Sequence, residues 1–161
     1  MTTTTWDPNV AQEHIDALKH LPGATLPILN ALQSEFGYID DAAIPLIADA
    51  LNLSRAEVVG VAHFYQDYRH EPPGRHTVKV CRAEACQSMG CDGLVEHVEA
   101  SMGVTMGKTT ADGAFTLEDV FCLGNCALSP SMMVDGRLYG RVSPARFDSI
   151  AGQVRSAEAQ R

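Results

Sequence analysis

Apolar residues in the first part of the chain recur every three or four positions, which is the period of an amphipathic helix. Asp7 followed by Pro8 indicates a capped helix start, and the spacing of Ser54 and Glu57 matches a capping box. Gly37 follows an apolar run and is typical of a residue that ends a helix. We therefore predict helices from Pro8 to about Leu21, through Ile28 to Phe36, through Ile44 to Leu51, and from Arg55 to about Tyr65.

The pattern changes at RHEPPGR, residues 69–75, where prolines and a glycine are typical of a linker. Beyond it, a strand-like run followed by a helical period indicates the start of a βα unit. The predicted elements are strands at 77–80, 115–121, 132–134 and 138–139, and helices over 92–101 and 143–154. This order is thioredoxin-like in outline. We predict an α+β fold with an N-terminal helical domain, residues 1–72, and a thioredoxin-like α/β domain, residues 73–161.

The chain is acidic, with 12 basic and 20 acidic side chains and a formal net charge of -8. A surface of that sign repels a phosphate backbone, so we expect no nucleic acid as partner. No apolar run is long enough to cross a bilayer, and the start MTTTTWDPN lacks the basic and apolar regions of a secretory signal. We expect a soluble protein without membrane insertion, located in a reducing cytoplasm where structural disulfides are rare.

The five cysteines are the clearest chemical signal in the sequence. Cys81 and Cys86 enclose four residues, Cys122 and Cys126 enclose three, and each pair follows a predicted strand in a glycine-bearing loop. A single cysteine is often an inert core residue, but close pairs are hard to obtain from packing alone. Two pairs predict one site with four thiolates that binds a metal or a cluster. Cys91 lies as far beyond Cys86 as Cys86 lies beyond Cys81, so a pairing of Cys86 with Cys91 stays open.

The lengths of these gaps bear on the kind of metal centre. Structural zinc sites commonly use gaps of two residues, although gaps of up to four occur. A [2Fe-2S] cluster is wider and needs two thiolates per iron, which longer loops can supply while their N–H groups point at the sulfurs. Gly90 and Gly124 would allow the loop backbone to approach the cluster sulfurs closely. Arg82 would either offset the negative charge of the cluster or remain a solvated surface charge. The spacing differs from that of plant-type ferredoxins, and neither loop contains the histidines of a Rieske centre.

We find no motif for substrate chemistry in the sequence. It contains no Gly-rich phosphate loop, no H-E-x-x-H motif and no G-x-S-x-G elbow, so we assign no catalytic residues. A thiol enzyme fits less well, because thioredoxin-type sites separate their cysteines by two residues and neither pair has that gap. The aromatic side chains of HFYQDY, residues 63–68, are expected in the core.

With both cysteine pairs placed, nearly the whole chain resembles the [2Fe-2S] subunit shared by NADH:quinone oxidoreductase, bidirectional hydrogenases and NAD-dependent formate dehydrogenases. The resemblance rests on LPILNALQSEFGYID, EVVGVAHFYQDY, the PPG linker, the first cysteine pair and CLGNCALSP. It implies that Cys81, Cys86, Cys122 and Cys126 ligate one [2Fe-2S] cluster on a thioredoxin-like domain. Cys91 lies outside that pattern, and we expect it to have a structural role.

Within this family, CRAEACQSMGCDG most resembles the gamma subunit of soluble, molybdenum-dependent formate dehydrogenase. The resemblance implies that formate is oxidised at molybdenum in a large subunit and that NAD is reduced at FMN in a flavoprotein subunit. This chain would be a non-catalytic electron-transfer subunit that exchanges single electrons with the FMN of its NADH-binding partner. The alternatives are the equivalent subunit of NADH:quinone oxidoreductase or of an NAD(P)-linked hydrogenase and, less well supported, a zinc-binding or thiol-redox thioredoxin-like protein.

Overall fold

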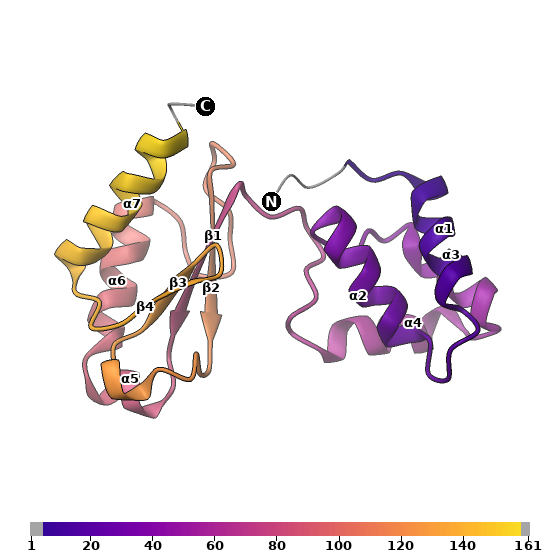
Figure 1. The fold of residues 1–161 in the computed structure, drawn as a ribbon, viewed down its shortest axis with the longest axis horizontal. Coiled ribbons are helices and arrows are strands. Elements are labelled where there is room, and N and C mark those ends of the chain that lie inside the picture. The colour runs from indigo at the N-terminus through magenta and orange to yellow at the C-terminus, as the bar shows by residue number, and fades with distance from the viewer. Residues whose placement is uncertain (1–4, 159–161) are drawn as a thin grey trace. The chain divides into compact units, whose positions relative to one another are not determined.

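Two compact units, joined between Pro73 and Gly74, make up the computed structural model, which describes residues 5–158 (Figure 1). The first unit is helical and the second contains a mixed β-sheet. In the part of the chain that is described, no helix combines the length and the apolar character needed to span a bilayer. The helices of the first unit are α1 (Pro8–Leu18), α2 (Thr25–Phe36), α3 (Ala43–Leu51) and α4 (Arg55–Phe64).

Local sequence signals explain where these helices begin and end. The Asp7 carboxylate accepts a hydrogen bond of 2.8 Å from the Asn9 N–H and caps α1, whose first residue is a proline. α2 ends at Gly37, whose φ of 83° is accessible to glycine at little cost. The predicted start of α1 and the predicted end of α2 are therefore confirmed.

The helices of the first unit enclose one apolar core, built from the faces that the sequence periodicity predicts. Leu29, Leu32 and Phe36 are buried on α2, where they pack with side chains from the other three helices. Beyond α4, Tyr68 is also buried, and its hydroxyl donates a 2.9 Å hydrogen bond to Asn30 Oδ1. This bond ties the segment after α4 back to α2.

Two of the aromatic residues expected in this core lie on the surface instead. Phe64 is 77% exposed and Tyr65 is 44% exposed, whereas Tyr68 is buried as expected. α4 buries the face that carries Val58 and Ala62, four residues apart, and the helix ends at Phe64. Phe64 lies off that face, and Tyr65, which would continue it, follows the end of the helix in an extended conformation, so the expectation was wrong for both.

Replacing Ser54 with alanine should destabilise the first unit by about 1 kcal/mol, because α4 loses its capping box. Ser54 Oγ accepts from the Glu57 N–H at 3.2 Å, and the Glu57 carboxylate accepts from the Ser54 N–H at 2.8 Å. Hydrogen bonds from the Ser54 N–H and hydroxyl lower the pKa of Glu57. The part of the capping box that depends on the Glu57 carboxylate is therefore complete above the ordinary carboxyl pKa and is lost as the pH falls through the lower folded value, whereas the bond from the Glu57 N–H to Ser54 Oγ remains. Urea unfolding measured at neutral pH and in acid checks the effect. An equal difference between the two proteins at both pH values would contradict it.

The second unit, as far as it is described, is built on one sheet of four strands. These are β1 (His76–Cys81), β2 (Phe115–Val120), β3 (Met132–Val134) and β4 (Arg137–Tyr139). Their order is β2-β1-β3-β4, with β1 and β2 parallel and the other neighbours antiparallel. The accompanying helices are α5 (Glu84–Ser88), α6 (Cys91–Met102), the 3₁₀ turn η1 (Cys126–Leu128) and α7 (Pro144–Glu158). The α+β fold class is confirmed, while α5 and η1 were not predicted.

The helices α6 and α7 pack with one face of this sheet to form the core of the second unit (Figure 1). Val78 on β1 lies opposite Leu117 on β2, and both side chains are buried in that core. Side chains alternate along a strand, so the next pair in the register, Lys79 and Glu118, lies on the opposite face. There the two side chains form an ion pair of 3.2 Å. This alternation fixes which residues reach each face of the sheet.

Candidate metal centre

The two cysteine pairs meet at one edge of the sheet because β1 and β2 run parallel. The register pairs Cys81, the last residue of β1, with Val120, the last residue of β2. Cys122 follows two residues beyond that partner, so the segments that carry Cys86 and Cys126 leave the sheet from the same edge. The sheet thus brings together two loops that are far apart in the sequence.

The first pair, Cys81 and Cys86, is buried. Both side chains pack together with Cys91 in a small cluster beside the partly buried Ala83 and Leu123. Cys86 lies on α5 rather than in the open loop that we predicted, and its N–H donates to the Ala83 carbonyl at 2.9 Å. A helix of five residues is too short to show a hydrophobic period, which is why the sequence pattern did not indicate it.

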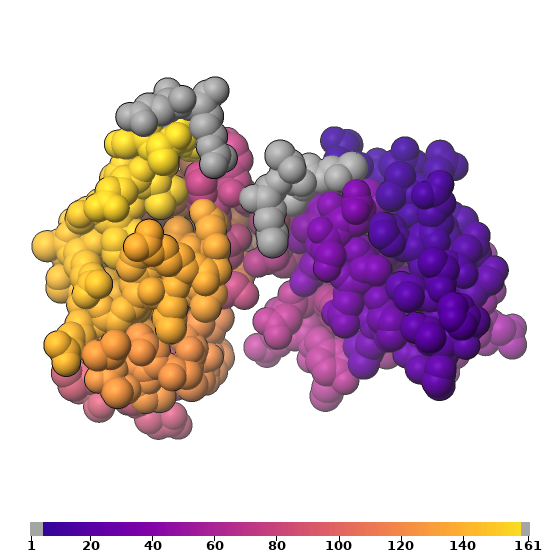
Figure 2. Space-filling view, in the orientation of Figure 1, coloured from indigo at the N-terminus to yellow at the C-terminus, as the bar shows by residue number. Residues whose placement is uncertain are grey.

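The second pair, Cys122 and Cys126, is exposed. Gly124 turns the chain between them with a φ of 71°, and its N–H donates to Cys122 Sγ at 3.3 Å. Cys126 begins η1, and the orange segment that includes this turn lies at the surface in Figure 2. One pair is therefore covered by protein, and the other is open to solvent.

The sulfurs within each pair interact, and the second loop packs against the first pair. Burial raises the pKa of Cys81, and the Cys86 thiol raises it further, although the backbone groups of Ala83 and Leu123 act to lower it. A hydrogen bond with Cys122 and the negative charge of the Cys122 thiolate raise the pKa of Cys126. Leu123 belongs to the second loop and packs against the cluster of Cys81, Cys86 and Cys91, so the two loops are in contact.

The surroundings of Cys86 favour its thiolate. Burial acts to raise the pKa of Cys86, but the Ser129 hydroxyl, the Ser131 N–H and the Cys81 thiol outweigh it and lower the pKa. Both serines are buried and flank Pro130, whose preceding peptide bond is cis. Neither serine was among our predicted site residues. The available signal was a Ser-Pro-Ser run directly after the second cysteine pair.

Two pairs of thiols are the donor set that a binuclear cluster requires. Within residues 5–158, no three His, Cys, Asp or Glu side chains lie close enough together to hold one ion. A structural zinc ion takes four ligands at one point, whereas each iron of a [2Fe-2S] cluster takes two thiolates and shares two sulfides. The N–H and O–H groups directed at the sulfurs would offset the negative charge of such a cluster. The donor set Cys81, Cys86, Cys122 and Cys126 therefore fits a [2Fe-2S] cluster.

Cys91 and Arg82 lie beside the first pair, and the structure bears on the roles considered for both. Burial and the neighbouring Asp92 raise the pKa of Cys91, so Cys86 is the better thiolate of the two.

Arg82 forms ion pairs with Asp119 at 3.4 Å and with Asp92 at 3.7 Å. Its charge is thus shared with two carboxylates rather than directed at the cysteines alone.

The two glycines of the cysteine loops adopt turns that the sequence did not reveal. A Cβ atom at Gly90 or Gly124 would meet no protein atom within 4 Å, so neither is needed for close packing of the protein. Both have a positive φ, 82° at Gly90 and 71° at Gly124, which side chains other than glycine rarely adopt. Both glycines therefore allow these turns, and a close approach to the cluster stays a prediction.

A thioredoxin-like domain whose strand ends present two cysteine pairs defines an iron–sulfur electron carrier. The family model for the thioredoxin-like [2Fe-2S] ferredoxin matches residues 11–155, and the chain belongs to this family. Its cofactor is a [2Fe-2S] cluster, as predicted.

Similar proteins include subunits of two kinds of oxidoreductase. An NADH-quinone oxidoreductase subunit of Pseudomonas aeruginosa is 39% identical over 75% of this chain and 73% of its own length. An NADH-quinone oxidoreductase subunit of Rhizobium meliloti is 36% identical over 84% of this chain and 80% of its own length. The NADP-reducing hydrogenase subunit HndA of Solidesulfovibrio fructosivorans is 31% identical over 88% of this chain and 82% of its own length.

Among solved structures, an NAD+-reducing [NiFe]-hydrogenase in the air-oxidized state shares the fold. Its TM-score is 0.68 at 23% identity, and the match covers 83% of this chain but only 23% of the hydrogenase chain. None of the relatives named above is a formate dehydrogenase subunit. They favour the alternative assignment, to a subunit of the quinone oxidoreductase or hydrogenase type, over the formate dehydrogenase branch.

Proposed function

We propose that this chain is an electron-transfer subunit in which Cys81, Cys86, Cys122 and Cys126 ligate its [2Fe-2S] cluster. The observation that carries this proposal is the parallel register, which ends with Cys81 opposite Val120 and so brings both pairs to one edge of the sheet. The bound cluster supplies one-electron chemistry. The chain itself supplies the thiolates, covers the first pair and directs hydrogen-bond donors at the sulfurs.

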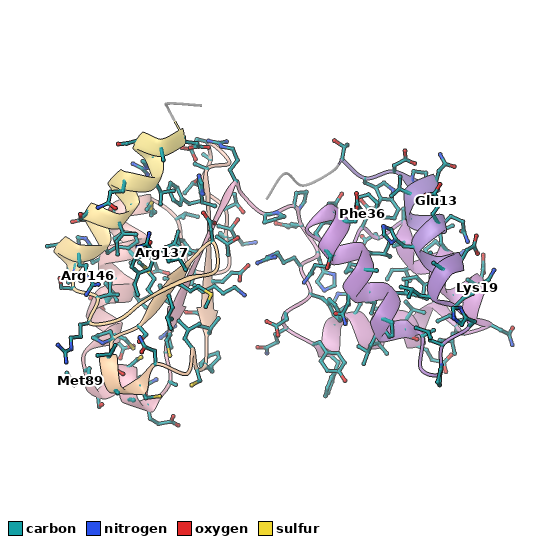
Figure 3. The ribbon with its side chains drawn as sticks, in the orientation of Figure 1. Glu13, Lys19, Phe36, Met89, Arg137 and Arg146 are labelled. Atoms are coloured by element: carbon teal, nitrogen blue, oxygen red, sulfur yellow. The ribbon has the colours of Figure 1, made fainter. Side chains whose placement is uncertain are left out.

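The surface around the exposed pair supports contact with a partner protein. Phe121 is 69% exposed, Met89 is 61% exposed and Leu128 is 41% exposed. Phe121 precedes Cys122, and Leu128 lies in η1 with Cys126. Met89, which is labelled in Figure 3, lines one groove together with Ser129 of the second loop. Large exposed apolar side chains next to a redox site are typical of a docking surface, and we propose a flavoprotein that binds NADH and FMN as the partner.

The complex that we propose is of the NADH:quinone oxidoreductase or NAD(P)-linked hydrogenase type. The identities of 39% to the quinone oxidoreductase subunit and 31% to the hydrogenase subunit support it. The formate dehydrogenase complex, with its molybdenum-containing large subunit, is the second candidate and is supported by the stretch CRAEACQSMGCDG. In each case we place the complex in the cytoplasm.

Purification without oxygen tests the cofactor. The protein should be red-brown, contain about two irons and about two acid-labile sulfides per chain, and give an EPR signal after reduction with dithionite. A colourless protein that contains zinc would refute the proposal.

Isolation of the native complex tests the partners. A co-purifying subunit that contains FMN should reduce the cluster with NADH as the electron source. Nickel or quinone reductase activity in the complex would identify the first candidate, and molybdenum with formate-dependent NAD reduction would identify the second. A complex without any flavoprotein would contradict the proposed partner.

A further inference from the structure

The Ser129 side chain contacts residues of both cysteine pairs. The Cys86 thiol, in the first pair, donates to its Oγ at 3.5 Å, and the serine hydroxyl donates to the carbonyl oxygen of Cys126, in the second pair, at 2.8 Å. The residue is 7% exposed, so water does not compete freely for its hydroxyl. A cysteine that ligates a metal has no thiol proton, so its sulfur is then an acceptor, and the one proton of the serine hydroxyl can go either to that sulfur or to the carbonyl.

The nearby Ser131 provides a contrast, because its hydroxyl is directed mainly at the backbone. Ser131 is 1% exposed, and its Oγ lies within hydrogen-bond distance of two carbonyl oxygens, that of Asn125 at 3.2 Å and that of Leu128 at 3.4 Å. Among the donors that lower the pKa of Cys86, the Ser129 hydroxyl has the largest effect and the Ser131 hydroxyl the smallest. Two buried serines in one loop thus differ in how closely their hydroxyls are tied to the sulfur.

We propose that Ser129 is a positioning residue that raises the reduction potential of the cluster by donating its hydroxyl proton to Cys86 Sγ in the reduced state. This inference rests on the proposed function, in which Cys86 is a ligand. When one electron passes from the partner flavin to the cluster, the ligand sulfurs gain negative charge, and a hydrogen bond to a more negative acceptor is stronger. The Ser129 hydroxyl then turns from the Cys126 carbonyl to the sulfur. Its proton stays on the serine, so the flavin loses one electron, the cluster gains one, and no proton is transferred.

A hydrogen bond that is stronger in the reduced state favours reduction, so its loss should make the potential more negative. The test is a redox titration of the full-length protein with its cluster, followed by EPR, for the wild type and for Ser129→Ala, Ser129→Thr and Ser131→Ala. Iron and sulfide content are measured on the same samples. In the wild type they test the proposed function, and in the variants they show whether a full cluster is present for the titration.

We expect Ser129→Ala to bind a full cluster with a more negative midpoint potential. Ser129→Thr keeps the hydroxyl and should remain near the wild-type potential, and Ser131→Ala should shift it by less than Ser129→Ala. The same potential in Ser129→Ala and the wild type would overturn the inference, as would an equal shift in all three variants. A Ser129→Ala protein that folds but binds no cluster would also overturn it, because the hydroxyl would then serve assembly. If Ser129→Ala does not fold, the comparison of Ser129→Thr and Ser131→Ala decides, and a larger shift in Ser129→Thr would contradict the proposal.

Discussion

Replacing Cys122 with alanine should abolish binding of the [2Fe-2S] cluster. One iron would keep only a single protein thiolate, and the exposed position of Cys122 leaves that iron open to water. The protein should be nearly colourless, with iron and acid-labile sulfide close to zero per folded chain. Visible absorbance, iron analysis and circular dichroism on the same sample would measure the loss and show that the fold is retained.

Cys91→Ala is the matched control for this prediction. Cys91 is also a cysteine of the same unit and is buried beside Cys81 and Cys86, but it lies outside the proposed ligand set. Its alanine variant should keep the full iron content and the wild-type spectrum. A Cys122→Ala protein that stays red-brown would refute the ligand set. A folded Cys91→Ala protein without iron would favour the pairing of Cys86 with Cys91.

Gly140→Ala should lower the free energy of unfolding by about 1–3 kcal/mol and reduce the iron content. A Cβ atom at Gly140 would lie 2.5 Å from Leu128 Cβ and 2.9 Å from the Leu128 carbonyl oxygen. Neither atom can move away by rotation of a flexible side chain, so η1 must shift, and Cys126 is the first residue of that turn. Urea unfolding followed by circular dichroism would measure the stability, and iron analysis would measure the effect on the site.

Gly152→Ala provides the opposite case. Gly152 lies in α7, and a Cβ atom there would meet nothing within 4 Å. Alanine has a higher helix propensity than glycine, so this variant should be more stable by about 1 kcal/mol, with unchanged iron content. If Gly140→Ala and Gly152→Ala changed the free energy of unfolding in the same direction, the close contact between Gly140 and η1 would not be the cause of the Gly140→Ala effect.

The sequence predicted well those features that depend on neighbouring residues. The buried face of α2 follows from the spacing of Leu29, Leu32 and Phe36, and the cap of α1 follows from Asp7. The cysteine pairs were visible for the same reason, because the two members of each pair are only a few residues apart in the sequence. Phe64 shows the limit of the method, since an apolar residue at the end of a helix has no periodic partner that tells whether it is buried.

Features that depend on contacts between distant segments could not be read from the sequence. Ser129 and Ser131 matter only because the second loop folds against Cys86, more than forty positions earlier in the chain. The glycines of the cysteine loops were recognised, but their positive φ values could not be known before the turns were seen. Likewise α5 is held by its surroundings and leaves no periodic signal of its own.

The register between β1 and β2 links the apolar interior to metal chemistry at the far end of the strands. A slip of one residue would turn Leu117 out of the interior, so the interior opposes any such slip. The same slip would displace Cys122 relative to Cys81. Mutations that loosen the packing around Leu117 can therefore cost the protein its iron even though they touch no ligand, and screens for cofactor loss in this family should include such interior positions.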